Sequence, residues 1–154
     1  MTNSTFGFDK PEDSPGFLLW QTTITWQRLI KKALDAYHIS HPQFVILAVT
    51  LWFENKTEEV PQSVIIRQSK LDKMTVSQSL KKLVIDDYIK RIEHKEDTRA
   101  KSVTLTNKGM ALITKLIPIV EKIDADFFGA IKKNDQRLLI GMLNNLVSRS
   151  ENTV

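Results

Sequence analysis

The strongest constraint on the fold is a change of hydrophobic period, from a helical repeat in residues 72–86 to alternation in residues 89–105. At 100° per residue, one narrow arc of the first segment is apolar and consists of Val76, Leu80 and Leu83. The opposite arc carries no acidic residue and consists of Met74, Gln78, Lys81 and Lys82. We therefore expect a helix that buries one face, followed by a β-hairpin with a charged tip.

A second, shorter helix is expected just before this one. It starts at Pro61 or Gln62, runs to Gln68, and is separated from Asp72 by a turn of three residues. Asp72 is a good N-cap for the longer helix. Two helices joined by so short a turn form a helix-turn-helix, which places its second helix in the major groove of DNA.

The flanking segments are expected to be helical as well. Ser14 followed by Pro15 begins a helix over 14–37, and Pro42 opens another that ends near Phe53. Thr106 caps a helix that runs to about Phe128, and a last helix begins at Asn134 or Asp135 and ends near Arg149. Pro118 lies inside the helix expected to end near Phe128, where it is expected to kink the helix or to cost it one backbone hydrogen bond.

The expected architecture is mainly α with a small β-hairpin wing, in one integrated domain. Residues 1–13 form a flexible arm, residues 40–106 form the winged helix-turn-helix, and residues 14–37 and 107–154 form dimerisation helices.

The positive charge of the chain is concentrated in its middle third. Residues 61–108 hold 11 Lys and Arg and 6 Asp and Glu, whereas the remainder holds 11 basic and 12 acidic residues. A local basic excess is what phosphate attraction and counterion release require.

Several function classes are excluded or disfavoured. The chain has no cysteine, so disulfides and thiolate chemistry are excluded. No nucleophile elbow, phosphate loop or paired carboxylates point to an enzyme or a cofactor, and His38 and His41 lack an acidic third ligand for zinc. Without a membrane span or a signal peptide, we expect a cytoplasmic protein.

The polar arc of the 72–86 helix has the chemistry of a base-reading surface. Gln78 can pair with adenine, and Met74 can contact a thymine methyl group. Lys81 and Lys82 can reach phosphates, and Thr75 and Ser77 can donate their hydroxyls to phosphates. An ordinary solvated helix face is the alternative for an isolated helix, and the order of the surrounding elements favours DNA binding.

Two side chains at the hairpin tip lie on the same side of an extended chain. Asp97 and Arg99 are two residues apart, so the carboxylate can hold the guanidinium extended toward a narrow minor groove. On spacing alone, an ordinary solvated β-turn explains these charges equally well.

Three stretches of the chain resemble the MarR family of winged-helix regulators. They are L-D-K-M-T-V-S-Q-S-L-K-K-L at residues 71–83, E-D-T-R-A at 96–100 and V-T-L-T-N-K-G at 103–109. S-H-P-Q-F at residues 40–44 also resembles that family's second helix, and the likeness covers nearly the whole chain after residue 13.

The resemblance implies a homodimer that binds a pseudo-palindromic operator on double-stranded DNA, usually as a repressor that small phenolic or aromatic molecules release. It implies that Arg99 enters the minor groove and that Asp97 orients it. The complete set of expected DNA-binding residues is Lys73, Met74, Thr75, Ser77, Gln78, Lys81, Lys82, Lys95, Asp97, Arg99 and Lys101.

The chain departs from the family at three points. Asp87 and Tyr88 stand where a glycine often precedes the first wing strand, and Gln78 replaces a frequent arginine of the recognition helix. The absence of cysteine excludes the peroxide-sensing branch.

Two further sites are expected outside the helix-turn-helix. The last two helices carry more apolar surface than a small domain buries by itself, which indicates a two-fold interface, with an intrachain bundle as the alternative. An effector pocket could lie where the helices expected over 14–37, 42–53 and 106–128 meet, lined by Trp20, Arg28, His41 and Trp52 together with Trp26. Ordinary core tryptophans are the alternative.

A different function remains open on the sequence alone, namely a winged helix that contacts proteins and has no effector response. The acid-free helix face argues against it. Salt dependence distinguishes the two, because only phosphate contacts predict a steep loss of affinity with salt.

Overall fold

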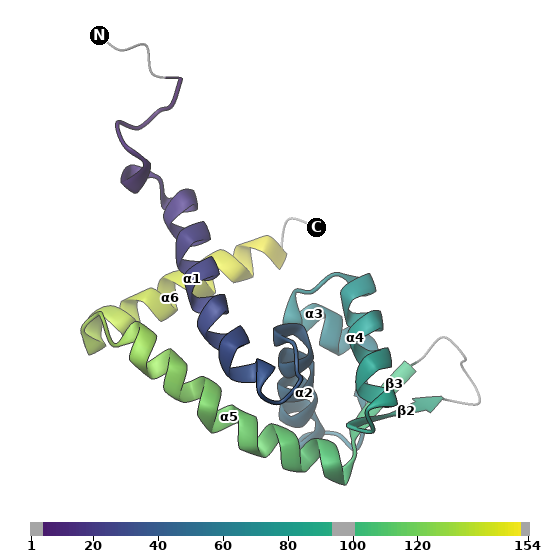
Figure 1. Cartoon of the computed structure of the whole chain (residues 1–154). Helices are drawn as coiled ribbons and strands as arrows, with labels where there is room; N and C mark the ends of the chain where they lie inside the picture. The colour runs from purple at the N-terminus through teal and green to yellow at the C-terminus, as the bar shows by residue number, and fades with distance from the viewer. Residues whose placement is uncertain (1–4, 94–100, 152–154) are drawn as a thin grey trace. The chain divides into compact units, whose positions relative to one another are not determined.

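The computed structural model describes residues 5–93 and 101–151, and its elements follow the expected order. The helices within these residues are α1 (Pro15–Asp35), α2 (His41–Glu54), α3 (Gln62–Ser69), α4 (Lys73–Ile85), α5 (Asn107–Phe128) and α6 (Lys133–Glu151), and a short 3-10 helix over Pro11–Asp13 precedes them. The strands are β1 (Val60–Pro61), β2 (Ile89–Glu93) and β3 (Lys101–Leu105). The fold is therefore mainly α with a small antiparallel sheet (Figure 1).

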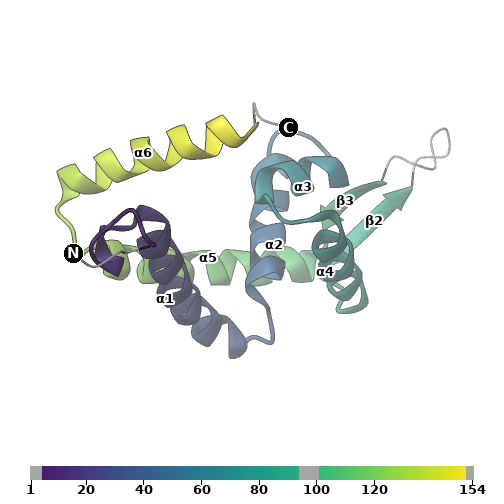
Figure 2. The same ribbon diagram turned by 90° about the horizontal axis from the view of Figure 1, so that it is seen from above.

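The chain divides into two compact units, Met1–Ile119 and Val120–Val154. In the first unit, α2 lies between α1 and the pair α3–α4, and the hairpin of β2 and β3 extends beyond this pair (Figure 2). The second unit consists of the end of α5 and of α6. None of the helices described combines the length and the apolar character that a membrane span requires.

Helix starts follow the expected capping chemistry. The Phe17 backbone N–H donates to Ser14 Oγ at 3.2 Å. Ser40 and Gln43 form a reciprocal capping box at the start of α2. The α5 helix begins after Thr106, as expected, and runs through Pro118 to Phe128.

The first helix ends two residues earlier than expected. His38 takes a left-handed backbone conformation, with φ of 58°. Its N–H donates to the Asp35 carbonyl, and the Ile39 N–H donates to the Leu34 carbonyl. These two bonds form a Schellman cap, which terminates α1 and turns the chain into α2.

The sheet has a strand that the sequence did not predict. β3 lies in the centre, between β2 and the two-residue β1, with Val60 opposite Val103. Two residues are too few to show alternation, and Pro61 argues against a strand except at an edge, which is where it lies.

The core of the first unit draws on α1 to α5 and on all three strands. Ile30 and Leu34 of α1 are fully buried, and so is Leu47 of α2. The other fully buried apolar side chains among the described residues are Ile46, Val60, Ile65, Val76, Leu80, Leu83, Ile89, Val103, Ile113 and Leu116. This core holds α4 by one face and leaves its other face exposed.

Candidate nucleic-acid interface

The α4 helix presents two chemically opposite faces, as the sequence predicts. Val76, Leu80 and Leu83 are fully buried. The expected polar arc is exposed and consists of Met74, Gln78, Lys81 and Lys82, with Thr75 and Ser77 partly exposed beside it. No Asp or Glu occurs from Lys73 to Ile85, so between its two capping residues, Asp72 and Asp86, the exposed face of α4 carries no negative charge.

The positive charges of this face differ in their surroundings. Lys82 Nζ lies 3.1 Å from the Asp86 carboxylate, so part of its charge is compensated. Lys73 and Lys81 are both exposed and have no ion-pair partner within residues 5–93 and 101–151. Lys73 and Lys81 are therefore the residues of α4 best suited to contact phosphates.

Asp72 and Thr75 form a two-bond contact at the start of α4. Asp72 accepts the Thr75 backbone N–H at 2.8 Å and the Thr75 hydroxyl at 2.7 Å, one on each carboxylate oxygen. The hydrogen bond from the Thr75 side chain, followed by that from its backbone, lowers the pKa of the Asp72 carboxyl. In this structure the Thr75 hydroxyl donates to Asp72, and its expected contact with DNA stays a prediction.

The wing is an antiparallel hairpin whose tip lies outside the described residues. In the register of β2 and β3, Ile89 lies opposite Leu105 and Glu93 opposite Lys101. Lys101 is exposed at the base of the hairpin, beside the tip. Lys95, Asp97 and Arg99 fall within residues 94–100, which the structure does not describe.

The turn from α4 into β2 is a Schellman cap with aspartate where glycine is usual. Asp87 has φ of 62°, its N–H donates to the Val84 carbonyl, and the Tyr88 N–H donates to the Leu83 carbonyl. Aspartate tolerates this left-handed conformation better than most residues do. The departure noted in the sequence therefore leaves the turn geometry intact.

The sequence L-T-N-K-G at residues 105–109 has a structural role, because its threonine and glycine attach α5 to this turn. Thr106 Oγ1 accepts the Gly109 N–H at 2.9 Å and donates to the Asp87 carbonyl at 2.6 Å, while the Thr106 N–H donates to the Tyr88 carbonyl at 3.1 Å. A Cβ on Gly109 would lie 1.9 Å from the Tyr88 carbonyl oxygen. Only glycine permits this approach of backbone to backbone.

Two residues that sequence analysis missed secure the same region. Lys108 donates to the Asp86 carbonyl at 2.9 Å, and its ammonium lies 4.7 Å from the centre of the Tyr88 ring. Glu54, at the end of α2, accepts hydrogen bonds from the Thr104 hydroxyl and the Leu105 N–H of β3. No spacing in the sequence signals these contacts, because they join elements far apart in the chain.

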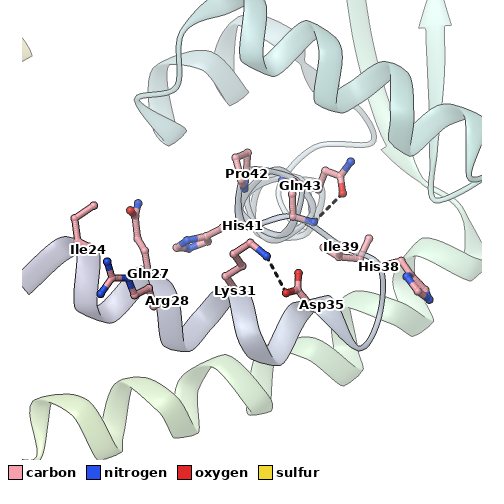
Figure 3. A pocket seen from close by; sticks show the side chains of 11 residues that line it. Ile24, Gln27, Arg28, Lys31, Asp35, His38, Ile39, His41, Pro42 and Gln43 are labelled. Atoms are coloured by element: carbon pink, nitrogen blue, oxygen red, sulfur yellow. Dashed lines mark hydrogen bonds and ion pairs between the residues drawn. The ribbon is translucent and has the colours of Figure 1, made fainter.

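A cavity of about 730 Å³ lies between α1 and the start of α2 (Figure 3). Within its lining, the Lys31 ammonium lies 2.8 Å from the Asp35 carboxylate, one helical turn further along α1 (Figure 3). Arg28 and His41, two of the expected effector residues, line it. The full lining is Ile24, Gln27, Arg28, Lys31, Asp35, His38, Ile39, Ser40, His41, Pro42 and Gln43.

Trp20 and Trp52 do not line this cavity, so the four expected effector residues do not form one site there. Both indoles are 65% exposed. Trp52 lies eleven residues beyond His41 on the same helix, a separation of about 16 Å along its axis. Trp26, by contrast, packs against His41, with ring centres 5.1 Å apart.

Comparison with known proteins agrees with this geometry. The family described as "ArnR1-like, winged-helix domain" matches residues 35–122. The HTH-type transcriptional regulator YdcH of Bacillus subtilis is 38% identical over 131 residues, which make up 85% of this chain and 89% of YdcH.

Two solved structures have the same fold at low sequence identity. Bordetella bronchiseptica BpsR, studied for regulation of its DNA binding by 6-hydroxynicotinic acid, superposes with a TM-score of 0.80 at 19% identity, covering 91% of this chain and 97% of BpsR. A mutant MarR from E. coli, complexed with operator DNA, superposes with a TM-score of 0.75 at 19% identity, covering 88% of this chain and 95% of that one. With its two-faced α4, its hairpin wing and these relatives, the chain belongs to the ArnR1-like winged-helix family of HTH-type transcriptional regulators, and its fold is that of the MarR regulators.

Proposed function

We propose that this regulator is a cytoplasmic repressor that binds a pseudo-palindromic operator as a homodimer and is released by a small effector. The observation that carries the proposal is the pair of faces on α4. Val76, Leu80 and Leu83 fix the helix in the core, while an exposed, basic, acid-free face points outward. A recognition helix needs both properties.

In this proposal α4 enters the major groove and the wing enters the adjacent minor groove. Gln78 reads a base edge, and Lys73 and Lys81 bind phosphates. Arg99 is assigned to the minor groove, with Asp97 orienting it. Two such units in a dimer read half-sites about 34–36 Å apart.

Exposed apolar side chains support the proposed dimer. On α6, Leu138, Met142 and Leu146 are four residues apart and are 61%, 59% and 63% exposed. On α1, Phe17 and Trp20 are also exposed. Apolar stripes of this length are typical of helices that pack against a second subunit.

The cavity between α1 and α2 supports an effector site. The Arg28 guanidinium has no ion-pair partner among the residues that the structure describes, and His38 and His41 line the same cavity. A planar guanidinium suits a carboxylate ligand. Because 6-hydroxynicotinic acid regulates the DNA binding of BpsR, aromatic carboxylic acids are the first ligands to test.

Footprinting on the DNA that flanks its own gene, followed by fluorescence anisotropy over a range of salt, tests the DNA-binding proposal. Lys81→Ala should weaken binding to all sequences and lower the salt slope by about one. Gln78→Ala should relax discrimination at one base pair, by about 1–3 kcal/mol. Lys132→Ala, in the α5–α6 connection, is the control with the same loss of charge.

Two results would contradict the proposal. If the affinity for DNA did not change with salt, a winged helix that binds proteins would be indicated instead. If Lys81→Ala lowered DNA affinity and salt slope no more than Lys132→Ala does, α4 would not be part of the DNA interface. In vitro transcription from the footprinted promoter then decides the sign of regulation, and repression is expected.

A further inference from the structure

The contact between Asp72 and Thr75 determines how the Thr75 hydroxyl can bond to anything else. A hydroxyl has one proton to donate and two lone pairs to accept with. The Asp72 carboxylate can only accept when it is ionised. Because Thr75 Oγ1 lies 2.7 Å from Asp72 Oδ2, the single hydroxyl proton is directed at Asp72.

The carboxylate is ionised under ordinary conditions. The two hydrogen bonds from Thr75 hold the pKa of Asp72 below its usual value of 3.8. The second bond, from the Thr75 backbone N–H at 2.8 Å, fixes the carboxylate at the helix start, so the side chain is not free to turn away. What Thr75 retains for an outside partner is its lone pairs.

Thr75 lies where such a preference can be used. It is partly exposed, in the first turn of α4, beside Met74 and on the side of the helix that carries Gln78. In the major groove, adenine and cytosine present amino groups, which donate. At that edge guanine presents the acceptors N7 and O6, and thymine presents the acceptor O4 and a methyl group. A hydroxyl oxygen that can only accept hydrogen bonds therefore distinguishes adenine and cytosine from guanine and thymine.

We propose that Asp72 is a positioning residue that fixes the Thr75 hydroxyl as a hydrogen-bond acceptor, so that Thr75 selects an adenine or a cytosine at the base it meets. The inference rests on the proposed function, because it requires α4 to read the major groove. It assigns to Asp72 a part in specificity beyond that of a helix cap.

The test begins by selecting bound duplexes from a random pool with the parent protein, which defines the preferred base at every position. The same selection is then made with three variants. Thr75→Val has the same shape and no hydroxyl, and it should lose roughly three- to tenfold of the preference at one position. Thr75→Ser keeps the hydroxyl and should keep the preference.

Asp72→Asn separates positioning from capping. Asparagine, like aspartate, is among the preferred N-cap residues. Its carbonyl oxygen can still accept the Thr75 N–H, but its amide can donate to the hydroxyl. The hydroxyl proton is then free to point outward, and the preference at the same position should shift from adenine or cytosine toward guanine or thymine.

A base analogue gives a readout that a purely structural role would not change. If the selected base is adenine, it is replaced by purine, which lacks the amino group. If it is cytosine, it is replaced by the corresponding pyrimidinone. The parent protein should lose roughly three- to tenfold in affinity for the analogue, and Thr75→Val should lose nothing further.

Each outcome is decisive. If Thr75→Val and Asp72→Asn change affinity equally for all sequences, the contact is only a cap and the inference is wrong. If the parent protein selects guanine or thymine at the position that Thr75→Val relaxes, the inference is wrong as well. If the parent selects no sequence, the proposed function fails before any variant is made, and this inference fails with it.

Discussion

Replacing Gly109 by alanine should destabilise the protein, although alanine is the better helix former. The added Cβ would lie 1.9 Å from the Tyr88 carbonyl oxygen, whereas real Cβ atoms essentially never come within 3.0 Å of another heavy atom. The backbone at position 109 or that at Tyr88 must therefore move by about 1.1 Å. The neighbouring hydrogen bond from the Thr106 N–H to the same oxygen, at 3.1 Å, is the first to be strained.

The expected magnitude combines three contributions. Overpacking costs about 1–3 kcal/mol. Losing the Thr106–Tyr88 hydrogen bond costs about 1 kcal/mol. The greater helix propensity of alanine over glycine offsets about 1 kcal/mol of this loss. The net loss is about 2 kcal/mol, which for a chain of this length lowers Tm by about 4–8 °C.

Urea denaturation followed by circular dichroism, with all proteins at one concentration, measures this loss. Gly141→Ala is the matched control, because a Cβ at that position in α6 meets no atom within 4 Å. It should raise the free energy of unfolding by about 0.5–1 kcal/mol. If Gly109→Ala were as stable as the parent while Gly141→Ala behaved as expected, the close approach of Gly109 to Tyr88 would be refuted.

Four further predictions concern single positions. Asp87→Gly should raise the free energy of unfolding by about 0.5–1 kcal/mol, because φ of 62° costs glycine nothing; lower stability in urea denaturation would contradict this. Leu146→Glu should shift the protein toward monomer in analytical ultracentrifugation, and an unchanged dimer would remove α6 from the interface. Arg28→Ala should abolish the effect of aromatic carboxylates on DNA affinity while leaving affinity without ligand unchanged, and a retained response would place the effector elsewhere. Folding lowers the pKa of Asp72, so the ionised carboxylate stabilises the protein at neutral pH, and this stabilisation is lost as the pH falls below about 4. The parent and Asp72→Asn should therefore differ less in thermal stability at pH 3 than at pH 7.

Local chemistry made the elements and the recognition helix predictable. Ser14 and Asp72 each cap the helix that the sequence assigned to them, and the buried face of α4 is the one that its period predicted. These features depend on neighbours three or four residues away, so the order of residues contains the information. The wing strands were predictable for the same reason, since alternation is visible within five residues.

Contacts between distant segments were decided by the tertiary structure alone. The two residues of β1 become a strand only because Val60 meets Val103, and Glu54 becomes an anchor only because the end of α2 reaches β3. The role of Gly109 depends on a carbonyl twenty-one residues earlier in the chain.

The cavity between α1 and α2 shows the same division between what the sequence and the tertiary structure determine. The composition of α1 and α2 predicted a pocket with Arg28 and His41, and the structure has both in its lining. It also predicted that Trp20 and Trp52 would join them, and they do not, because a rigid helix keeps residues eight and eleven positions apart far from one another. Sequence alone determines which side chains a helix carries on each face, whereas folding in three dimensions decides which faces meet.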